Sequence, residues 1–415
     1  MDRDLPRNAM STIEASLRTF RVVVLTGARQ AGKSTLVRKV ARGRGGTILD
    51  LDDPTTLDAV TRDPLSVIGS ARPPVVIDEF QRGGDALLRC VKSIVDRTPR
   101  PGRFLLTGST RFLTVPTLSE SLAGRADLVD LWPLSQGELR RTREGWIDRL
   151  FASVDAVRSI AVRPEGRIDV LTAVCRGGYP EIRAADAVQR RRWFDAYVRT
   201  VTERDVREIS GVRRASDLVR LLRMLAARTA QEMNASDIGR DLKVARSTLD
   251  EHLALLETVH LWHRLPAWST NLTAKVVRHP KAYLVDSGLA ARLVGATPAA
   301  LASAMHPALG PLVETFVVGE VARQQTWAET SCRLHHFRDR GGPEVDLVLE
   351  ADDGRIAAIE VKASATVGSS DFKGLELLRD RLKDRFLHGV VLYLGEKILS
   401  FGDRLTAVPV PALWS

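Results

Sequence analysis

The sequence has few cysteines and no long apolar run, and each lack argues against a class of protein. Its 415 residues include only Cys90, Cys175 and Cys332, which lie far apart. A disulfide framework or a cysteine-based zinc site needs paired spacing, so reduced core thiols are predicted instead. No run approaches the roughly 18 apolar residues that span a bilayer, and residues 1–10 lack a signal-peptide core. A cytoplasmic protein without membrane association is therefore predicted. The eight histidines show no metal-ligand spacing.

The composition is otherwise that of a globular protein with a basic balance. Apolar residues make up 44% and charged residues 27% of the chain, as in soluble proteins. The length exceeds one ordinary core and predicts two to four domains. The net charge of +10 is compatible with binding a polyanion. Charge alone does not select nucleic-acid-binding proteins, so a supporting motif is needed.

A phosphate-binding loop lies near the amino end. Residues 22–35 read VVVLTGARQAGKST and match G-x-x-x-x-G-K-[ST] at every fixed position. The glycines let backbone N–H groups approach phosphates, the lysine reaches the β- and γ-phosphates, and the serine can ligate Mg²⁺. A strand, a loop and a helix follow in order, which favours ATP binding over a bland Gly-rich turn. The predicted nucleotide-binding residues are Gly27, Gly32, Lys33, Ser34 and Thr35.

Two further strands supply polar residues for the same site. The run PPVVIDEF ends in Asp78, a predicted magnesium ligand like Ser34, and Glu79, predicted to polarise the attacking water. Residues 103–107 form the next strand, so Thr107 and Ser109 are expected at the ligand edge of a parallel sheet. They are predicted to contact the γ-phosphate or the lytic water; the alternative is a simple turn at Gly108.

Residues 121–139, SLAGRADLVDLWPLSQGEL, complete a set of motifs. The order GARQAGKST, VVIDEF, LLTGST, LAGR, LWPLS-x-x-E resembles the prokaryotic AAA+ superfamily ATPases that carry a nuclease-like C-terminal domain of uncertain role. The arginine of the LAGR element matches Arg125, and the resemblance implies that it stabilises the phosphoryl-transfer transition state, in its own chain or a neighbouring subunit. The alternative is a surface arginine that pairs with Asp127 or Asp130.

The middle of the chain is helical. Apolar spacing predicts helices over residues 145–230, where the turn GGYPE and the helix RRWFDAYVRTVTERDVREIS resemble the linker of the same family. The apolar stripe of that helix, from Trp193 to Val201, is predicted to pack in the core.

Residues 234–263 resemble a helix-turn-helix, and the later segment VVRHPKAYLVD is the expected wing. Asn234 or Ser236 is expected to cap the first helix, a turn is expected at residues 244–246, and Ser247 is expected to cap the second helix. The second helix carries Asp250, Glu251 and Glu257, unlike a helix that reads DNA, so a packing or protein-contact role is favoured. Lys243, Arg246 and Lys275 are the candidate DNA contacts.

The C-terminal part has the element order of the restriction-endonuclease-like fold. A helix at 311–324 precedes three strands, a second helix near 372–383 and a fourth strand. Asp346 is on the second strand, and Glu360 and Lys362 alternate on the third, so both point to one face. This arrangement resembles the D…E-x-K nuclease signature, in which carboxylates hold Mg²⁺ and the lysine orients a water. Glu314 or Glu320 is a further candidate ligand; the alternative is a polar sheet edge.

The sequence therefore predicts an α/β protein of four parts. They are an AAA+-like P-loop ATPase domain (1–145), a helical linker (146–215), a winged helix (216–298) and a restriction-endonuclease-like domain (299–415). The predicted function is ATP hydrolysis, with Mg²⁺, coupled to DNA binding, remodelling or cleavage by a homo-oligomer. The alternative is a nucleotide-dependent switch whose inactive nuclease-like domain binds a protein partner. The predicted catalytic residues are Glu79, Arg125 and Lys362, and the predicted metal ligands are Ser34, Asp78, Glu314, Asp346 and Glu360.

Overall fold

A computed structural model of the chain describes residues 5–108, 122–206, 215–269, 279–339 and 342–415. Two compact units are present: Met1–Leu134 with Glu257–His260, and Ser135–Leu256 with Leu261–Ser415. The first boundary lies 11 residues before the predicted end of the ATPase domain at 145. None of the described helices is long and apolar enough to cross a membrane.

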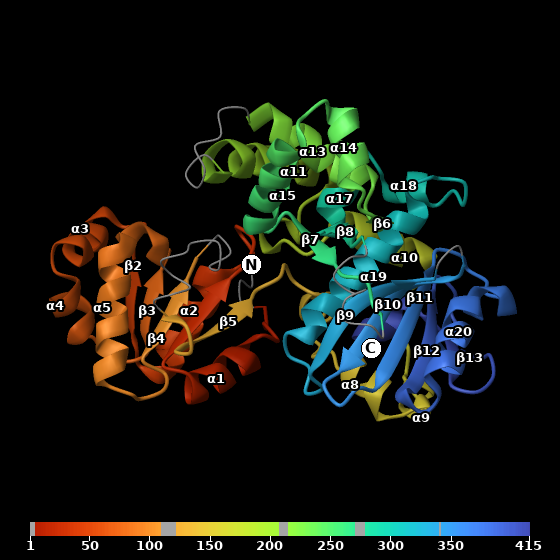
Figure 1. Cartoon of the computed structure of the whole chain (residues 1–415), viewed down its shortest axis with the longest axis horizontal. Helices are drawn as coiled ribbons and strands as arrows, with labels where there is room; N and C mark the ends of the chain where they lie inside the picture. The colour runs from red at the N-terminus through yellow and green to blue at the C-terminus, as the bar shows by residue number, and fades with distance from the viewer. Residues whose placement is uncertain (1–4, 109–121, 207–214, 270–278, 340–341) are drawn as a thin grey trace. The chain divides into compact units, whose positions relative to one another are not determined.

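The first unit is built on a five-stranded parallel sheet (Figure 1). The strand order is β2-β3-β4-β1-β5, and every pair of neighbours is parallel. The strands are β1 (Val22–Thr26), β2 (Thr47–Asp50), β3 (Val75–Asp78), β4 (Phe104–Thr107) and β5 (Ala126–Asp130). Because parallel strands end at one edge, the predicted site residues after β1, β3 and β4 share that edge.

Helices cover both faces of this sheet, which explains why its strands are continuous apolar runs. Val22 and Val24 of β1 pack in a core that includes side chains of α5 (Gly84–Arg97), with α3 (Pro54–Arg62) and α4 (Pro64–Gly69). The alternate residues, Val23 and Leu25, pack in a second core with α1 (Met10–Thr19) and α2 (Lys33–Arg44). The alternation follows from successive side chains pointing to opposite faces.

The second unit begins with short helices: α7 (Gln136–Leu139), α8 (Trp146–Ala152), α9 (Val154–Arg158), α10 (Arg167–Arg176) and α11 (Ala187–Thr200), which continues as a π-helical turn at Val201–Asp205. The predicted aromatic stripe does pack in the core: Trp193 stacks on Tyr197 with ring centroids 4.9 Å apart, and the Tyr179 hydroxyl donates to that of Tyr197 at 3.0 Å. The turn before Tyr179 needs glycine, because a Cβ on Gly177, at φ +70°, would lie 2.2 Å from Asp286.

The next elements are α13 (Ala215–Ala227), β6 (Gln231–Glu232), α14 (Ala235–Leu242), α15 (Arg246–Thr258), β7 (Trp262–Leu265) and β8 (Lys281–Leu284). The three strands form an antiparallel sheet of order β6-β8-β7. Asn234 caps α14 by accepting from the backbone N–H of Ser236 at 3.0 Å. The predicted cap Ser247 is wrong: α15 starts at Arg246, two residues before the helix start that a cap at Ser247 implies, because the left-handed Lys243 ends α14 and shortens the turn. Lys275 lies outside the described residues.

The C-terminal elements follow the predicted order. After α17 (Ser287–Leu293) and α18 (Pro298–Leu301) come α19 (Leu309–Gln325), β9 (Cys332–Arg338), β10 (Glu344–Ala351), β11 (Ile356–Lys362), α20 (Lys373–Leu382) and β12 (Phe386–Tyr393). Two strands were not predicted, β13 (Leu399–Ser400) and β14 (Leu405–Pro409). The sheet order is β13-β14-β12-β11-β10-β9, with β9, β10 and β11 antiparallel and β12 parallel to β11.

Candidate functional site

The loop between β1 and α2 has the backbone of a phosphate cradle. Gly27 and Gly32 have φ values of +147° and +97°, which side-chain-bearing residues rarely adopt. A Cβ on Gly27 would lie 2.2 Å from the carbonyl oxygen of Leu131, so only glycine fits there. Ser34 is half-buried and Thr35 is exposed in the first turn of α2, whose N-terminus favours an anion.

The lysine of the motif lies inside this loop. Lys33 is 6% exposed, and its Nζ donates to the carbonyl oxygens of Gly27 at 2.9 Å and Ala28 at 3.0 Å. The ammonium is therefore held at the loop's concave side, where the β- and γ-phosphates of a nucleotide bind. A cation and backbone N–H groups in one loop are the donors that a polyphosphate requires.

A segment before α1 supports the loop from outside. Arg7 donates to the carbonyl oxygen of Ala31 and to that of Trp132, each at 2.6 Å. It thereby joins the phosphate loop to the chain that follows β5. Sequence reasoning missed this contact, because Arg7 lies outside every motif.

Asp78 and Thr107 meet at the ends of β3 and β4. The Thr107 hydroxyl donates to the carboxylate of Asp78 and accepts from the backbone N–H of Glu79 at 3.1 Å. Asp78 is 2% exposed, and Thr107 is fully buried. The prediction that these residues share one edge with the phosphate loop is thus supported. Ser109 lies outside the described residues, and its predicted role stays a prediction.

Glu79 has a backbone conformation that side-chain-bearing residues seldom adopt. Its φ is +54°, in the left-handed region, and its carboxylate accepts from Nε2 of Gln81 at 2.6 Å. Left-handed residues other than glycine carry strain and gather at functional sites. The hydrogen bond from Gln81 limits the rotation of the carboxylate.

Two residues near Asp78 were not predicted. Arg38 of α2 places Nη2 2.7 Å from a carboxylate oxygen of Asp50, at the end of β2, and 3.9 Å from one of Asp78. The guanidinium therefore brings positive charge to the edge where magnesium and phosphate would bind. A helical arginine four residues after the motif serine carries no sequence signal of this contact.

Arg125 lies at the other end of the sheet. It directly precedes β5, and its carbonyl oxygen accepts from the N–H of Val22, the first residue of β1. A five-residue strand spans about 13 Å at about 3.3 Å per residue, so the arginine is distant from its own phosphate loop. Its Nε lies 2.5 Å and its Nη2 3.2 Å from the two carboxylate oxygens of Asp96. Arg125 therefore pairs with Asp96 and not with Asp127 or Asp130, the predicted alternatives. A role of Arg125 in the site of a neighbouring subunit stays a prediction.

The second unit contains a buried cluster of charges on three elements. Glu314 of α19 and Asp346 of β10 lie on opposite sides of one cation, the ammonium of Lys281 on β8. Nζ is 2.8 Å from Oε1 of Glu314 and 2.8 Å from Oδ1 of Asp346. Tyr283 donates its hydroxyl to the same oxygen of Glu314 at 2.6 Å. Sequence reasoning missed Lys281, because it lies in the predicted winged helix and not in the nuclease-like domain.

Glu360 and Lys362 form a second pair beside this cluster. Nζ of Lys362 lies 2.8 Å from Oε1 of Glu360, as expected for residues that alternate on one face of β11. The other carboxylate oxygen, Oε2, is buried and has no hydrogen-bond partner among the described residues. Oδ2 of Asp346 accepts from the backbone N–H of Val361 at 2.9 Å.

The predicted metal ligands do not gather as a metal site. Among the described residues, no group of three or more His, Cys, Asp or Glu side chains could hold a metal ion. Glu320, the alternative to Glu314, is directed elsewhere: it accepts from the N–H of Gln136 at 2.8 Å and lies 3.5 Å from Arg323. Metal binding by Glu314, Asp346 and Glu360 therefore stays a prediction, one that the position of Lys281 opposes.

Burial controls the proton affinity of these groups. It raises the pKa of Glu314 to about 8, with repulsion by Asp346 in the same direction and Lys281 acting against it. It likewise raises the pKa of Glu360 to about 8. For Lys281 burial lowers the pKa, but attraction to Asp346 and Glu314 outweighs burial, and the net pKa lies above its usual value. Lys281 is therefore an ammonium at neutral pH.

Models of known protein families match three separate regions of the chain. Residues 19–140 match an AAA domain, residues 167–300 match a domain of unknown function (DUF8612), and residues 309–413 match another domain of unknown function (DUF4143). An uncharacterized protein of Mycobacterium tuberculosis is 31% identical over 406 residues, which cover 97% of this chain and 83% of that protein. An uncharacterized protein of Mycobacterium bovis gives the same values. The chain belongs to the family of these mycobacterial proteins.

Within this family, the region at 19–140 is an AAA domain of the P-loop ATPase type. The sequence expectation of a P-loop ATPase is thus confirmed at this level. The match to DUF4143 does not name a nuclease. An uncharacterized protein of Haemophilus influenzae is more distant, at 23% identity over 46% of each chain.

Two solved structures share part of the arrangement. The Walker-type ATPase of Pyrococcus abyssi is 18% identical and covers 71% of this chain and 100% of its own, with a TM-score of 0.43. The Holliday junction branch migration motor RuvB of Thermotoga maritima is 17% identical, covers 63% of this chain and 90% of its own, and has a TM-score of 0.30. These scores are too low to carry a functional inference.

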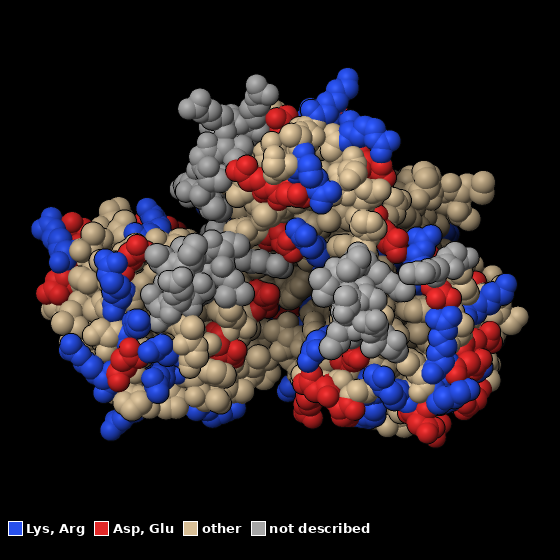
Figure 2. All heavy atoms as spheres, viewed as in Figure 1, with Lys and Arg blue, Asp and Glu red and all other residues tan. Residues whose placement is uncertain are grey.

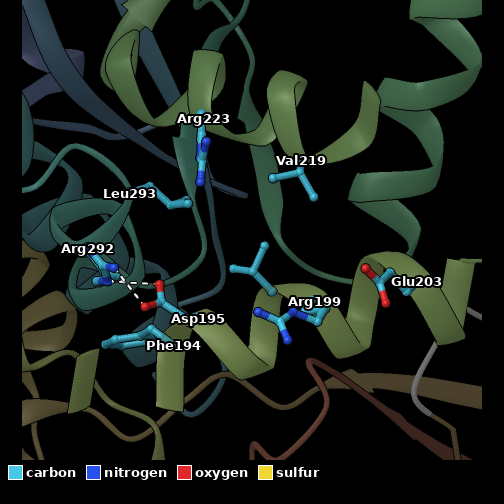
Figure 3. Close-up of a pocket in the computed structure, with 9 residues that line it drawn as sticks. Phe194, Asp195, Arg199, Glu203, Val219, Arg223, Arg292 and Leu293 are labelled. Carbon is cyan, nitrogen blue, oxygen red and sulfur yellow. Dashed lines mark hydrogen bonds and ion pairs between the residues drawn. The ribbon is translucent and has the colours of Figure 1, made fainter. Parts of the chain in front are cut away.

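The part of this chain that matches DUF8612 contains a pocket of about 530 Å³. Sequence reasoning did not predict it. It lies between α11 with its π-helical turn, α13 and α17 (Figure 3). Arg292 binds the carboxylate of Asp195 through two contacts, at 3.0 and 2.7 Å. Arg199 and Arg223 also line the pocket and form no ion pair with a described residue. The acidic Glu203 lines the pocket as well, so apolar side chains there lie beside charges of both signs.

Proposed function

We propose that the chain hydrolyses ATP with the help of magnesium. The observation that carries this proposal is the grouping of Lys33, Asp78, Thr107 and Glu79 at one edge of the parallel sheet. Lys33 and the loop N–H groups would hold the β- and γ-phosphates. Ser34 and Asp78 are the proposed magnesium ligands. The bound ion would neutralise part of the phosphate charge.

Glu79 is the proposed group that orients the attacking water. Its backbone N–H is bound by Thr107, and its carboxylate is bound by Gln81, so its position is fixed from both sides. A carboxylate positioned in this way can accept a proton from water as attack proceeds.

The test is the Glu79→Gln variant. The amide keeps the shape of the side chain but cannot accept the proton, so we expect unchanged ATP affinity and a fall in kcat on the order of a hundredfold or more. Asp52→Asn, a change at an exposed neighbouring carboxylate, serves as the control. Phosphate release and equilibrium binding of ATP are measured for both. A kcat near that of the wild type would remove Glu79 from the mechanism.

We infer further that nucleotide turnover acts as a switch for a protein partner, and that DNA is not cleaved. The charge on α15 supports this inference over DNA reading. Arg246 is paired with Asp250 at 2.8 Å, and Glu251 is exposed beside them. On the face drawn in Figure 2, basic side chains lie among acidic ones. A groove-reading helix instead offers free donors to base edges.

This second function is tested by trapping the ATP state. Glu79→Gln with ATP and the wild type with ADP are compared by hydrogen exchange; a switch predicts different protection in residues 135–415. Identical exchange would contradict the switch.

Binding of a labelled DNA duplex is measured at low and high salt with both nucleotides. Saturable binding that weakens steeply with salt and is lost in Lys243→Glu would favour DNA as the partner.

A further inference from the structure

The cluster around Lys281 contains a built-in cation where the sequence leads one to expect a metal ion. Lys281 is 4% exposed, and its ammonium contacts one oxygen each of Glu314 and Asp346. Its aliphatic stem comes from β8, within the region that matches DUF8612, whereas both carboxylates lie in the region that matches DUF4143. One family region therefore supplies the counter-ion for the acidic residues of another.

The ammonium stands where a divalent ion shared by Asp346 and Glu314 would bind. It already contacts one oxygen of each carboxylate, and magnesium or manganese would seek the same oxygen-rich position. Two like charges held within about 4 Å of each other in a buried site repel strongly, so metal and ammonium exclude each other. Oε2 of Glu360 is buried and has no hydrogen-bond partner among the described residues. The acidic residues therefore offer more oxygen atoms than Lys281 binds.

We propose that Lys281 is the resident cation of this cluster and keeps it closed to divalent metal ions. Because β8 pairs with β6 and β7, the sheet holds the backbone of Lys281 in place beside the two carboxylates. The C-terminal carboxylates are thus latent: the chain carries metal-binding groups that the middle region locks. This proposal rests on the cluster alone and stands whether or not the chain hydrolyses ATP.

The test measures Mn²⁺ binding to the full-length chain without nucleotide. The electron paramagnetic resonance signal of free Mn²⁺ reports how much of the ion stays unbound. In the wild type, we expect no site that depends on Asp346. Lys281→Met keeps most of the side-chain volume but removes the charge, so it should gain one Mn²⁺ site, with an affinity above any residual wild-type affinity by on the order of a hundredfold or more. Adding Asp346→Asn to Lys281→Met should abolish the gained site. Lys373→Met, at an exposed lysine of α20, is the matched control.

Each outcome decides the proposal. A wild-type site that Asp346→Asn removes would overturn it, as would a folded Lys281→Met chain that gains no site. If Lys281→Met does not fold alone, its folding is measured by circular dichroism with millimolar Mn²⁺. Recovery would support the exchange of ammonium for metal, and a chain that stays unfolded would count against it.

Discussion

The Thr107 hydroxyl donates to the carboxylate of Asp78, and the same oxygen accepts from the N–H of Glu79 at 3.1 Å. One side chain on β4 thus orients both acidic residues that end β3. We expect Thr107→Val, which keeps the shape and removes the hydroxyl, to lower kcat by about ten- to a hundredfold, the effect of losing a hydrogen bond to a charged group. Steady-state phosphate release measures it. Thr55→Val, at an exposed residue in the first turn of α3, is the control; equal rates for both variants would contradict the role of Thr107.

Lys33→Ala should abolish measurable ATP binding. The variant loses the cation that neutralises the β- and γ-phosphates, and the carbonyls of Gly27 and Ala28 lose their donor. Fluorescence titration with a labelled ATP measures the affinity. Lys39→Ala, on the same helix but exposed, should bind as the wild type does. ATP affinity retained by Lys33→Ala would refute the assignment of the loop.

Arg125→Ala should leave the kcat of an isolated subunit unchanged. The arginine lies at the amino end of the sheet with Asp96, away from its own phosphate loop. Turnover is therefore measured at dilutions where light scattering shows monomers. A loss of kcat in the monomer would contradict the placement of Arg125. In an assembled protein, rescue on mixing Arg125→Ala with Glu79→Gln subunits would instead indicate a role in trans.

The stability of the second unit should depend on the protonation of Glu144. This residue is 3% exposed, and burial, together with repulsion by Glu320, raises its pKa from 4.5 to about 7. The folded state therefore binds the proton more tightly than the unfolded state does. Stability from this group is fully present below pH 4.5 and is lost as the pH rises to about 7, by about 3 kcal/mol.

Glu144→Gln tests this dependence. The amide oxygen can still accept from the N–H of Gly137, which lies 2.6 Å from Oε1 of Glu144, but the side chain no longer titrates. We expect the variant to gain stability relative to the wild type between pH 5 and about 7. Urea unfolding at several pH values measures the difference, with Glu329→Gln, at an exposed residue, as the control. A difference that does not change with pH would exclude Glu144 as the source.

The nucleotide site was largely predictable because its signals are local. Val22–Thr26 and the glycines after it specify a strand, a loop and a helix within one short segment. The element order of the C-terminal part was predictable for the same reason. The position of Arg125 was not predictable. This residue belongs to a recognised motif, but the pairing of β5 with β1 decides at which end of the sheet it lies.

Lys281 illustrates a second limit. Its neighbours in sequence give no sign of the acidic residues that it contacts, and Asp346 lies 65 residues away along the chain. The signature D…E-x-K was read correctly as a set of residues on neighbouring strands. Metal binding by these carboxylates stays a prediction; under the proposal for Lys281, a counter-ion contributed by a distant strand changes what they can bind.

The contact of Arg7 with Ala31 and Trp132 has a practical consequence for studying this protein. A chain shortened to begin at α1 would lack both hydrogen bonds, and the phosphate loop would lose its external support. A deletion that removes Arg7 thus acts on the phosphate loop, although no motif lies at that position.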